Sequence, residues 1–248
     1  MLIFSYAFVV TLLHILRIPS NYYGVVCDAI MLITSLISLL IGYFTVKHFG
    51  VDSAQGKSIL FITLAILFWF IGDTLWVLVF SEATVSVADV FYLVGYPLFG
   101  VGIYFGITTF YPALLNDPKK VIPASIVFLI VSLLYFRMVP VAWDGSVSML
   151  ENIVSNGYVL VDLVLLAAVI SLAASTFTGM FNYPWMIVAL GTAAFLSGDI
   201  YYAINQKAYQ HGNLIDLAWY FGVLLYGVAF VMMKRRAERA FSMINGSR

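Results

Sequence analysis

The chain has 248 residues, of which 63% are apolar and 10% are charged, and its mean hydropathy is +1.01. Soluble domains carry about 25% charged residues, so this composition excludes a soluble globular protein and predicts an integral membrane protein. The formal net charge of zero argues against a nucleic-acid partner, and the single cysteine, Cys27, excludes an internal disulfide framework.

Eight apolar runs follow one another along the chain, and a helix needs about 20 such residues to cross a bilayer. The predicted spans are Met1–Leu16, Tyr22–Val46, Ser58–Phe80, Ala88–Tyr111, Val121–Val139, Ile153–Phe177, Tyr183–Ile204 and Leu214–Met233. The connections are short and contain turn-forming residues, so none holds a soluble domain. The sequence therefore predicts an all-α integral membrane protein with eight transmembrane helices. Residues 1–236 form one membrane domain and residues 237–248 a cytoplasmic tail.

Lysine and arginine are distributed unequally between the two sides of this predicted bundle. One side collects Lys47, Lys57, Lys119, Lys120, Lys234, Arg235, Arg236 and Arg239. The other side receives Arg17, Arg137 and Lys207. Because basic loops stay in the cytoplasm, we expect both termini to be cytoplasmic in a multi-pass protein of the cell membrane.

One acid-bearing helical hairpin occurs twice, first in residues 68–106 and again in residues 195–230. The matched pairs are Asp73 and Asp199, Trp76 and Tyr202, Asp89 and Asp216, and Tyr92 and Trp219. Asp28 and Asp162 also fall at one depth in the second helix of each half. These matches predict two four-helix repeats, residues 1–116 and 119–236. An even number of crossings gives both repeats the same orientation, so their two-fold axis runs along the membrane normal.

The predicted topology places several acidic residues in or beside the outer half of the membrane, where an ionised carboxylate at mid-helix costs about 2.5–3.5 kcal/mol. Helical spacing puts aromatic side chains on the same faces, and their O–H and N–H groups can hold a carboxylate in its charged form. The predicted ligand-binding residues are Asp28, Asp73, Trp76, Asp89, Tyr92, Tyr96, Asp162, Asp199, Tyr202, Asp216 and Trp219. We expect an outward-facing site for a cation or a small cationic molecule. The residues leave open whether a metal binds there.

Each of these features also has a structural interpretation. Asp89 and Asp216 begin helices, where an aspartate caps free backbone N–H groups. The aromatic residues can form an interfacial belt against the lipid headgroups. Asp73 and Asp199 can hold the two halves together through hydrogen bonds between helices.

The segments "GDTLW", "VADVFYLVGYPLFGVG" and "LIDLAWYFGVLLYGVAF" resemble the multi-pass membrane sensor regions that precede GGDEF, EAL, PAS or histidine-kinase modules in bacterial proteins. The resemblance implies a sensory input module that signals to a cytoplasmic domain or a separate partner. The positions that carry the resemblance are Asp73, Trp76, Asp89, Tyr92, Tyr96, Asp216 and Trp219. It implies no particular ligand.

The first "GD" and the segment "GTAAFLSGDIYYAIN" are similar to motifs of the eight-helix lysoplasmalogenase family. That resemblance implies that Asp73 and Asp199 are the acid and base of a vinyl-ether lipid hydrolase. The basic and histidine positions expected beside those motifs are not evident in this chain. A cation transporter or channel is a further alternative, although a parallel repeat with acids at one depth argues against transport. No P-loop, HExxH, CxxC or nucleophile-elbow motif occurs, so no cofactor is expected.

Overall fold

The computed structural model describes residues 2–17, 22–80, 85–115, 122–176, 179–206 and 208–246, and all regular structure in these ranges is helical. The helices are α1 (Leu2–Leu16), α2 (Tyr23–Phe49), α3 (Ala54–Leu75), α4 (Val87–Leu115), α5 (Ile122–Ala142), α6 (Met149–Ser175), α7 (Asn182–Asn205) and α8 (Asp216–Gly246). A π-helical turn, η2 (Trp76–Phe80), continues α3. Helices are the expected form of a membrane chain, because bilayer hydrocarbon offers no partners to backbone polar groups.

A helix lies at each of the predicted apolar runs, and six of them are long and apolar enough to cross a membrane. These six are α2, α3 with η2, α4, α6, α7 and α8. The apolar stretches of α1 and α5 are shorter, covering 5–16 and 128–142 in the described residues. The prediction of a multi-pass, all-helical membrane protein is therefore confirmed. Helix α8 continues beyond the predicted end at Met233, so the described part of the predicted tail, 237–246, is helical.

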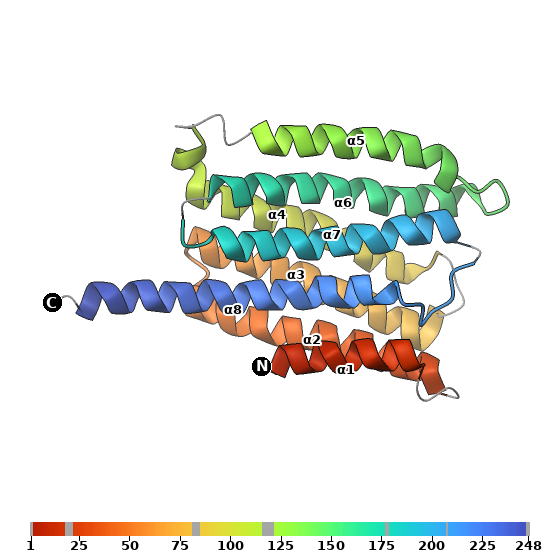
Figure 1. Ribbon diagram of the computed structural model, residues 1–248, viewed down its shortest axis with the longest axis horizontal. Helices are drawn as coiled ribbons and strands as arrows, with labels where there is room; N and C mark the ends of the chain where they lie inside the picture. The colour runs from red at the N-terminus through yellow and green to blue at the C-terminus, as the bar shows by residue number, and fades with distance from the viewer. Residues whose placement is uncertain are drawn as a thin grey trace.

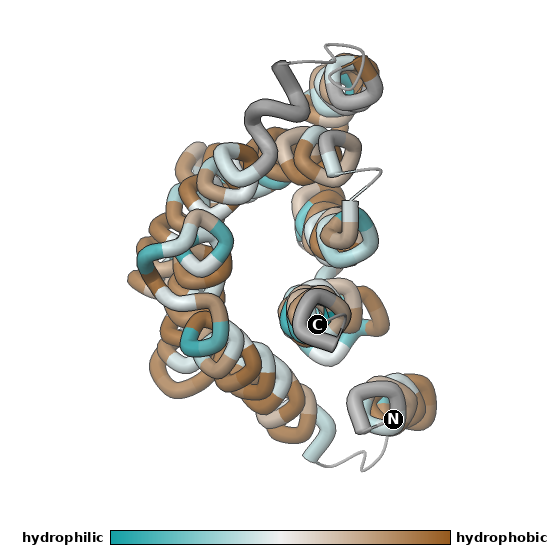
Figure 2. Tube along the Cα trace, turned by 90° about the vertical axis from the view of Figure 1, so that its left-hand side faces the viewer, coloured by the Kyte–Doolittle hydropathy of each residue, from teal (hydrophilic) through white to brown (hydrophobic). Residues whose placement is uncertain are grey.

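Six helices form a closed ring with their axes nearly parallel (Figures 1 and 2). Each contacts the next in the order α2, α3, α4, α6, α7 and α8, and α8 returns to α2. Helix α5 packs outside the ring on α6 and α7. Helix α1 also lies outside, where Val10 packs against Ile30 of α2 and Leu217 of α8. The ring brings the third and seventh helices to opposite walls.

Small residues let the ring helices approach closely. Ser58 of α3 donates a hydrogen bond to the carbonyl of Gly102 on α4 at 2.7 Å, and Ser38 of α2 donates to that of Val223 on α8 at 2.9 Å. A Cβ atom on Gly191 of α7 would lie 2.8 Å from the carbonyl oxygen of Gly222 on α8. Membrane helices associate through such close packing because lipid tails remove the hydrophobic driving force between them.

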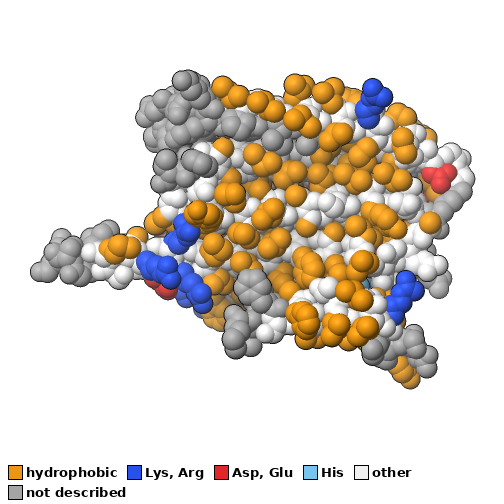
Figure 3. Space-filling view, in the orientation of Figure 1, with side chains coloured by type: hydrophobic (Ala, Val, Ile, Leu, Met, Phe, Trp, Pro, Cys, Tyr) orange, Lys and Arg blue, Asp and Glu red, His pale blue; other side chains and the backbone are white. Residues whose placement is uncertain are grey.

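The interior of the ring is filled by a large apolar core near mid-bundle and towards the end that carries the loop between α2 and α3. Its members include Ile62, Trp69, Phe99, Trp185 and Tyr226. The outer surface is covered by apolar side chains, with basic side chains gathered where α8 leaves the bundle (Figure 3). Packing therefore closes one half of the ring and leaves the other half for polar side chains.

Candidate functional site

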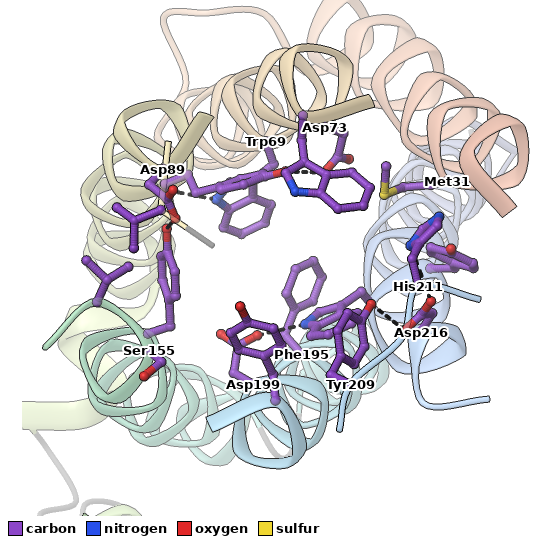
Figure 4. Close-up of a pocket in the computed structure, with 18 of the residues that line it drawn as sticks. Met31, Trp69, Asp73, Asp89, Ser155, Phe195, Asp199, Tyr209, His211 and Asp216 are labelled. Atoms are coloured by element: carbon purple, nitrogen blue, oxygen red, sulfur yellow. Dashed lines mark hydrogen bonds and ion pairs between the residues drawn. The ribbon is translucent and has the colours of Figure 1, made fainter. Parts of the chain in front are cut away.

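A cavity of about 370 Å³ occupies the ring at the end that carries the loops before α4, α6 and α8 (Figure 4). Its acidic lining residues are Asp73, Asp89, Glu151, Asp199 and Asp216. Its aromatic lining residues are Trp69, Trp76, Tyr92, Tyr96, Tyr158, Phe195, Tyr202, Tyr209, Trp219 and Tyr220. The volume is in the range of small-molecule sites, about 300–1,000 Å³.

On the α3 wall, Asp73 is held by side chains from two neighbouring helices. The Tyr92 hydroxyl of α4 donates to Asp73 Oδ1 at 3.1 Å, and the Ser35 hydroxyl of α2 donates to Oδ2 at 3.4 Å. Gly72 makes room for this contact, because a Cβ atom there would lie 2.6 Å from the Tyr92 ring. The carboxylate is thus oriented by a phenol and a hydroxyl.

On the opposite wall, Asp199 of α7 has a corresponding set of partners. Trp219 Nε1 of α8 donates to Asp199 Oδ1 at 2.7 Å, and the Tyr96 hydroxyl of α4 donates to Oδ2 at 3.2 Å. The carboxyl of Asp162 on α6, which is 2% exposed, lies within hydrogen-bonding reach of Asp199. Two carboxyl groups can hydrogen-bond only when one carries a proton, so this pair holds at most one negative charge.

The two walls repeat the same contacts. A Cβ atom on Gly198 would lie 2.6 Å from Trp219, as one on Gly72 would from Tyr92. Deeper in the ring, Gly95 accommodates Trp69 and Gly222 accommodates Phe195 in the same way.

The second helix of each half also contributes one partner to its aspartate. Ser35 of α2 donates a hydrogen bond to Asp73, and Asp162 of α6 lies within hydrogen-bonding reach of Asp199. Ser35 and Asp162 are separated in the sequence by the same distance as Tyr92 and Trp219. Asp28 of α2 lies against His211 and not against Asp73.

Asp89 and Asp216 each bind a backbone N–H group and also line the cavity. The backbone N–H of Ser86 donates to Asp89 Oδ2 at 2.6 Å, and that of Gly212 donates to Asp216 Oδ2 at 2.7 Å. The Asp89 bond is the carboxylate half of a capping box on α4, whereas the Asp216 bond holds the loop that precedes α8. Each carboxylate also accepts a phenol hydroxyl, from Tyr158 at 2.6 Å and from Tyr209 at 2.8 Å.

The loop between α7 and α8 contributes His211 to the wall. His211 Nε2 lies 2.7 Å from Asp28 Oδ1, its Nδ1 lies 3.6 Å from Asp216 Oδ2, and its ring packs 5.0 Å from that of Trp76. Burial, and secondly the charge of Asp216, raise the pKa of the Tyr209 phenol in the same loop. Tyr209 therefore stays protonated and serves Asp216 as a donor.

The structure brings all the predicted site residues except Asp28 and Asp162 to the wall of this cavity. Asp28 lies beside the wall, against His211, and Asp162 lies behind Asp199. The prediction missed Ser35, Tyr158, Tyr209, His211 and Tyr220. Tyr158 lies one helical turn before Asp162, and this spacing was the signal that could have found it.

The chemistry of the wall favours a cation. The described lining residues include no lysine or arginine, and the imidazole of His211 already lies between two carboxylates. Within the described ranges, no group of three or more His, Cys, Asp or Glu side chains is arranged to hold a metal ion. Aromatic faces bind organic ammonium groups through cation–π attraction, so an organic cation fits this wall better than a desolvated metal ion.

Comparison of the chain with protein-family models, with curated proteins and with solved structures finds no match. The resemblances to membrane sensor regions and to lysoplasmalogenases therefore stay predictions from the motifs.

Proposed function

We propose that this chain is a membrane-embedded sensory input module whose outward-facing cavity binds a small organic cation. In this proposal all eight helices cross the cell membrane and both termini are cytoplasmic. The cavity then opens on the outer side, because the basic residues of the loops and of α8 gather at the other end of the bundle. Two parallel four-helix repeats build the ring, with α1 and α5 as the outer helix of each repeat.

The matched contacts of the two walls support the repeat. In each half, a glycine next to the deep aspartate accommodates the aromatic donor of the following helix, as Gly72 does for Tyr92 and Gly198 does for Trp219. Chance similarity in hydropathy does not produce the same glycine, donor and carboxylate in the same arrangement twice. A duplicated four-helix unit accounts for it directly.

The observation that carries the proposed function is the pairing of Asp73 and Asp199 with phenol or indole donors instead of basic side chains. Such donors favour the charged carboxylate without neutralising it. The described wall therefore gives Asp73 and Asp199 no basic side chain that would compete with a ligand cation. Aromatic faces beside each of them supply the complementary surface for an ammonium group.

Helix α8 offers a route from the cavity to the cytoplasm. It is one helix of 31 residues, and its first turns contribute Asp216, Trp219 and Tyr220 to the cavity wall. Its far end extends beyond the other helices (Figure 1). A ligand that shifts α8 at the cavity shifts the same rigid element on the cytoplasmic side, where an output domain or partner can read it.

Thermal unfolding of the purified protein tests this function. We expect tetramethylammonium and butylamine to raise the melting temperature with increasing concentration, as mass action requires. Butanol, which is uncharged, should leave it unchanged. Equal melting curves with every organic cation and with none would contradict the proposal.

The hydrolase alternative retains one favourable observation, because Asp73 and Asp199 open onto the same intramembrane cavity with different partners. It predicts release of aldehyde from vinyl-ether lysolipids in liposomes, abolished in Asp73→Asn. The transport alternative needs a path through the ring. The packed core that includes Trp69, Phe99 and Tyr226 lies in that path.

A further inference from the structure

The two deep carboxylates of the cavity lie on opposite walls (Figure 4). Asp73 projects from α3 and Asp199 from α7, and α3 and α7 are not neighbours in the ring. The cavity therefore presents two separate anionic positions, each with its own hydrogen-bond donors.

Each carboxylate belongs to a subsite of the same construction. The Asp73 subsite contains Tyr92 as donor and Trp76 as an aromatic wall, and the Asp199 subsite contains Trp219 and Tyr202 in these roles. The subsites share an aromatic floor, because the rings of Trp69 and Phe195 meet with their centroids 5.1 Å apart. One molecule can thus reach both subsites while its apolar part lies on this floor.

A second, independent feature marks the cavity as a place for a polar ligand. Tyr220 lines the cavity and is 3% exposed, and its hydroxyl has no hydrogen-bond partner among the described residues. A buried hydroxyl without a partner is costly. A ligand N–H group can supply that partner where a small shift of the wall opens the hydroxyl to the cavity.

From this geometry we propose that the cavity takes a short α,ω-diammonium compound, with one ammonium group at Asp73 and the other at Asp199. The inference rests on the proposed function and names its ligand class. A monocation compensates one carboxylate and leaves the other in a partly dry cavity, whereas a dication compensates both. The linking methylenes lie on the floor formed by Trp69 and Phe195.

Calorimetric titration of the full chain in lipid nanodiscs tests this inference, with putrescine and butylamine as probes of similar length. We expect putrescine to bind about tenfold more tightly than butylamine or better, since its second ammonium meets a second subsite. In Asp73→Asn and in Asp199→Asn, putrescine should bind no more tightly than butylamine. Asp52→Asn, the same change in an exposed loop at the other end of the bundle, should retain the full difference.

A series of diamines on the wild-type protein makes the test independent of any variant that unfolds. Affinity should pass through a maximum at one chain length, because the distance between two fixed subsites selects the linker. Equal affinity for putrescine and butylamine, or a diamine series without a maximum, overturns the diammonium inference and leaves the proposed organic-cation site standing. Binding of neither probe overturns both.

Discussion

The hydroxyl of Tyr96 on α4 donates a hydrogen bond to Asp199 on α7 at 3.2 Å, and so joins the two halves of the ring across the cavity. In the second half, Val223 corresponds to Tyr96, because the two are separated in the sequence by the same distance as Tyr92 and Trp219. Valine has no hydroxyl group, so it cannot donate an equivalent hydrogen bond to Asp73. The two subsites are therefore similar but unequal. Asp199 has the additional neighbours Tyr96 and Asp162, whereas Asp73 has Ser35.

This inequality predicts that cation binding at Asp199 depends on pH. The hydrogen bond between the Asp162 and Asp199 carboxyls requires a proton, and a cation at Asp199 competes with that proton. Affinity for butylamine, which stays charged, should therefore fall as the pH is lowered, and binding should release protons. Titrations in two buffers of different ionisation enthalpy measure this release.

The Asp162→Asn variant isolates the contribution of the Asp162–Asp199 pair to proton release. The asparagine amide is a permanent hydrogen-bond donor and replaces the shared proton. The other titratable groups near the pair are Tyr96, Tyr158, Tyr202 and Tyr226, which are phenols. We expect the variant to release fewer protons than wild type. Equal proton release from the two proteins would exclude the pair as the source.

The unpartnered hydroxyl of Tyr220 predicts a change in binding without a loss of stability. Tyr220→Phe removes a group that makes no hydrogen bond within the described part of the chain, so the stability of the ligand-free protein should hold or rise. Loss of its bond to the ligand should weaken binding by about 0.5–1.5 kcal/mol. Tyr226→Phe is the matched control, since Tyr226 interacts with Thr192 at 3.3 Å in the core. The Tyr226→Phe variant should lower the stability of the protein and leave its affinity for the cation unchanged. A loss of stability in Tyr220→Phe, or a loss of affinity in Tyr226→Phe alone, would refute the role of the Tyr220 hydroxyl in binding.

The close packing of Gly198 against Trp219 predicts a strong effect of one methyl group. In Gly198→Ala the new Cβ atom displaces the indole that donates to Asp199, and overpacking costs about 1–3 kcal/mol. We expect both the free energy of unfolding and cation affinity to fall. Gly24→Ala on α2 meets nothing within 4 Å and should not be destabilising. Similar behaviour of the two variants in chemical unfolding would show that the glycine is not needed for this contact.

The proposed orientation predicts which loops an impermeant thiol reagent reaches in intact cells. In a Cys27→Ala background, cysteines at Val87 and Gln210, both exposed near the cavity, should react from outside. A cysteine at Val51, exposed at the other end, should react only after permeabilisation. Labelling of the Val51 position in intact cells would reverse the orientation and move the cavity to the cytoplasmic side.

The sequence by itself determined the class of protein, the places of the helices and the residues that share one face of a helix. Bilayer hydrocarbon forces every spanning segment to satisfy its own backbone, so apolar runs locate helices with few alternatives. Three- and four-residue spacing put Asp73 with Trp76, and Asp89 with Tyr92, on common faces. These shared faces follow from spacing within one helix, so the sequence is sufficient to find them.

The tertiary structure alone decided which helices are neighbours, and hence which acids share the cavity. Membrane helices are apolar on the lipid side and on the packed side, so hydropathy does not indicate which face of a helix points inward. The order of the ring brought Tyr158 to Asp89, Tyr96 to Asp199 and His211 to Asp28, which are contacts between segments far apart in the sequence. It also placed Ser35 of α2 against Asp73, because the close packing of α2 on α3 sets the partner of this buried carboxylate.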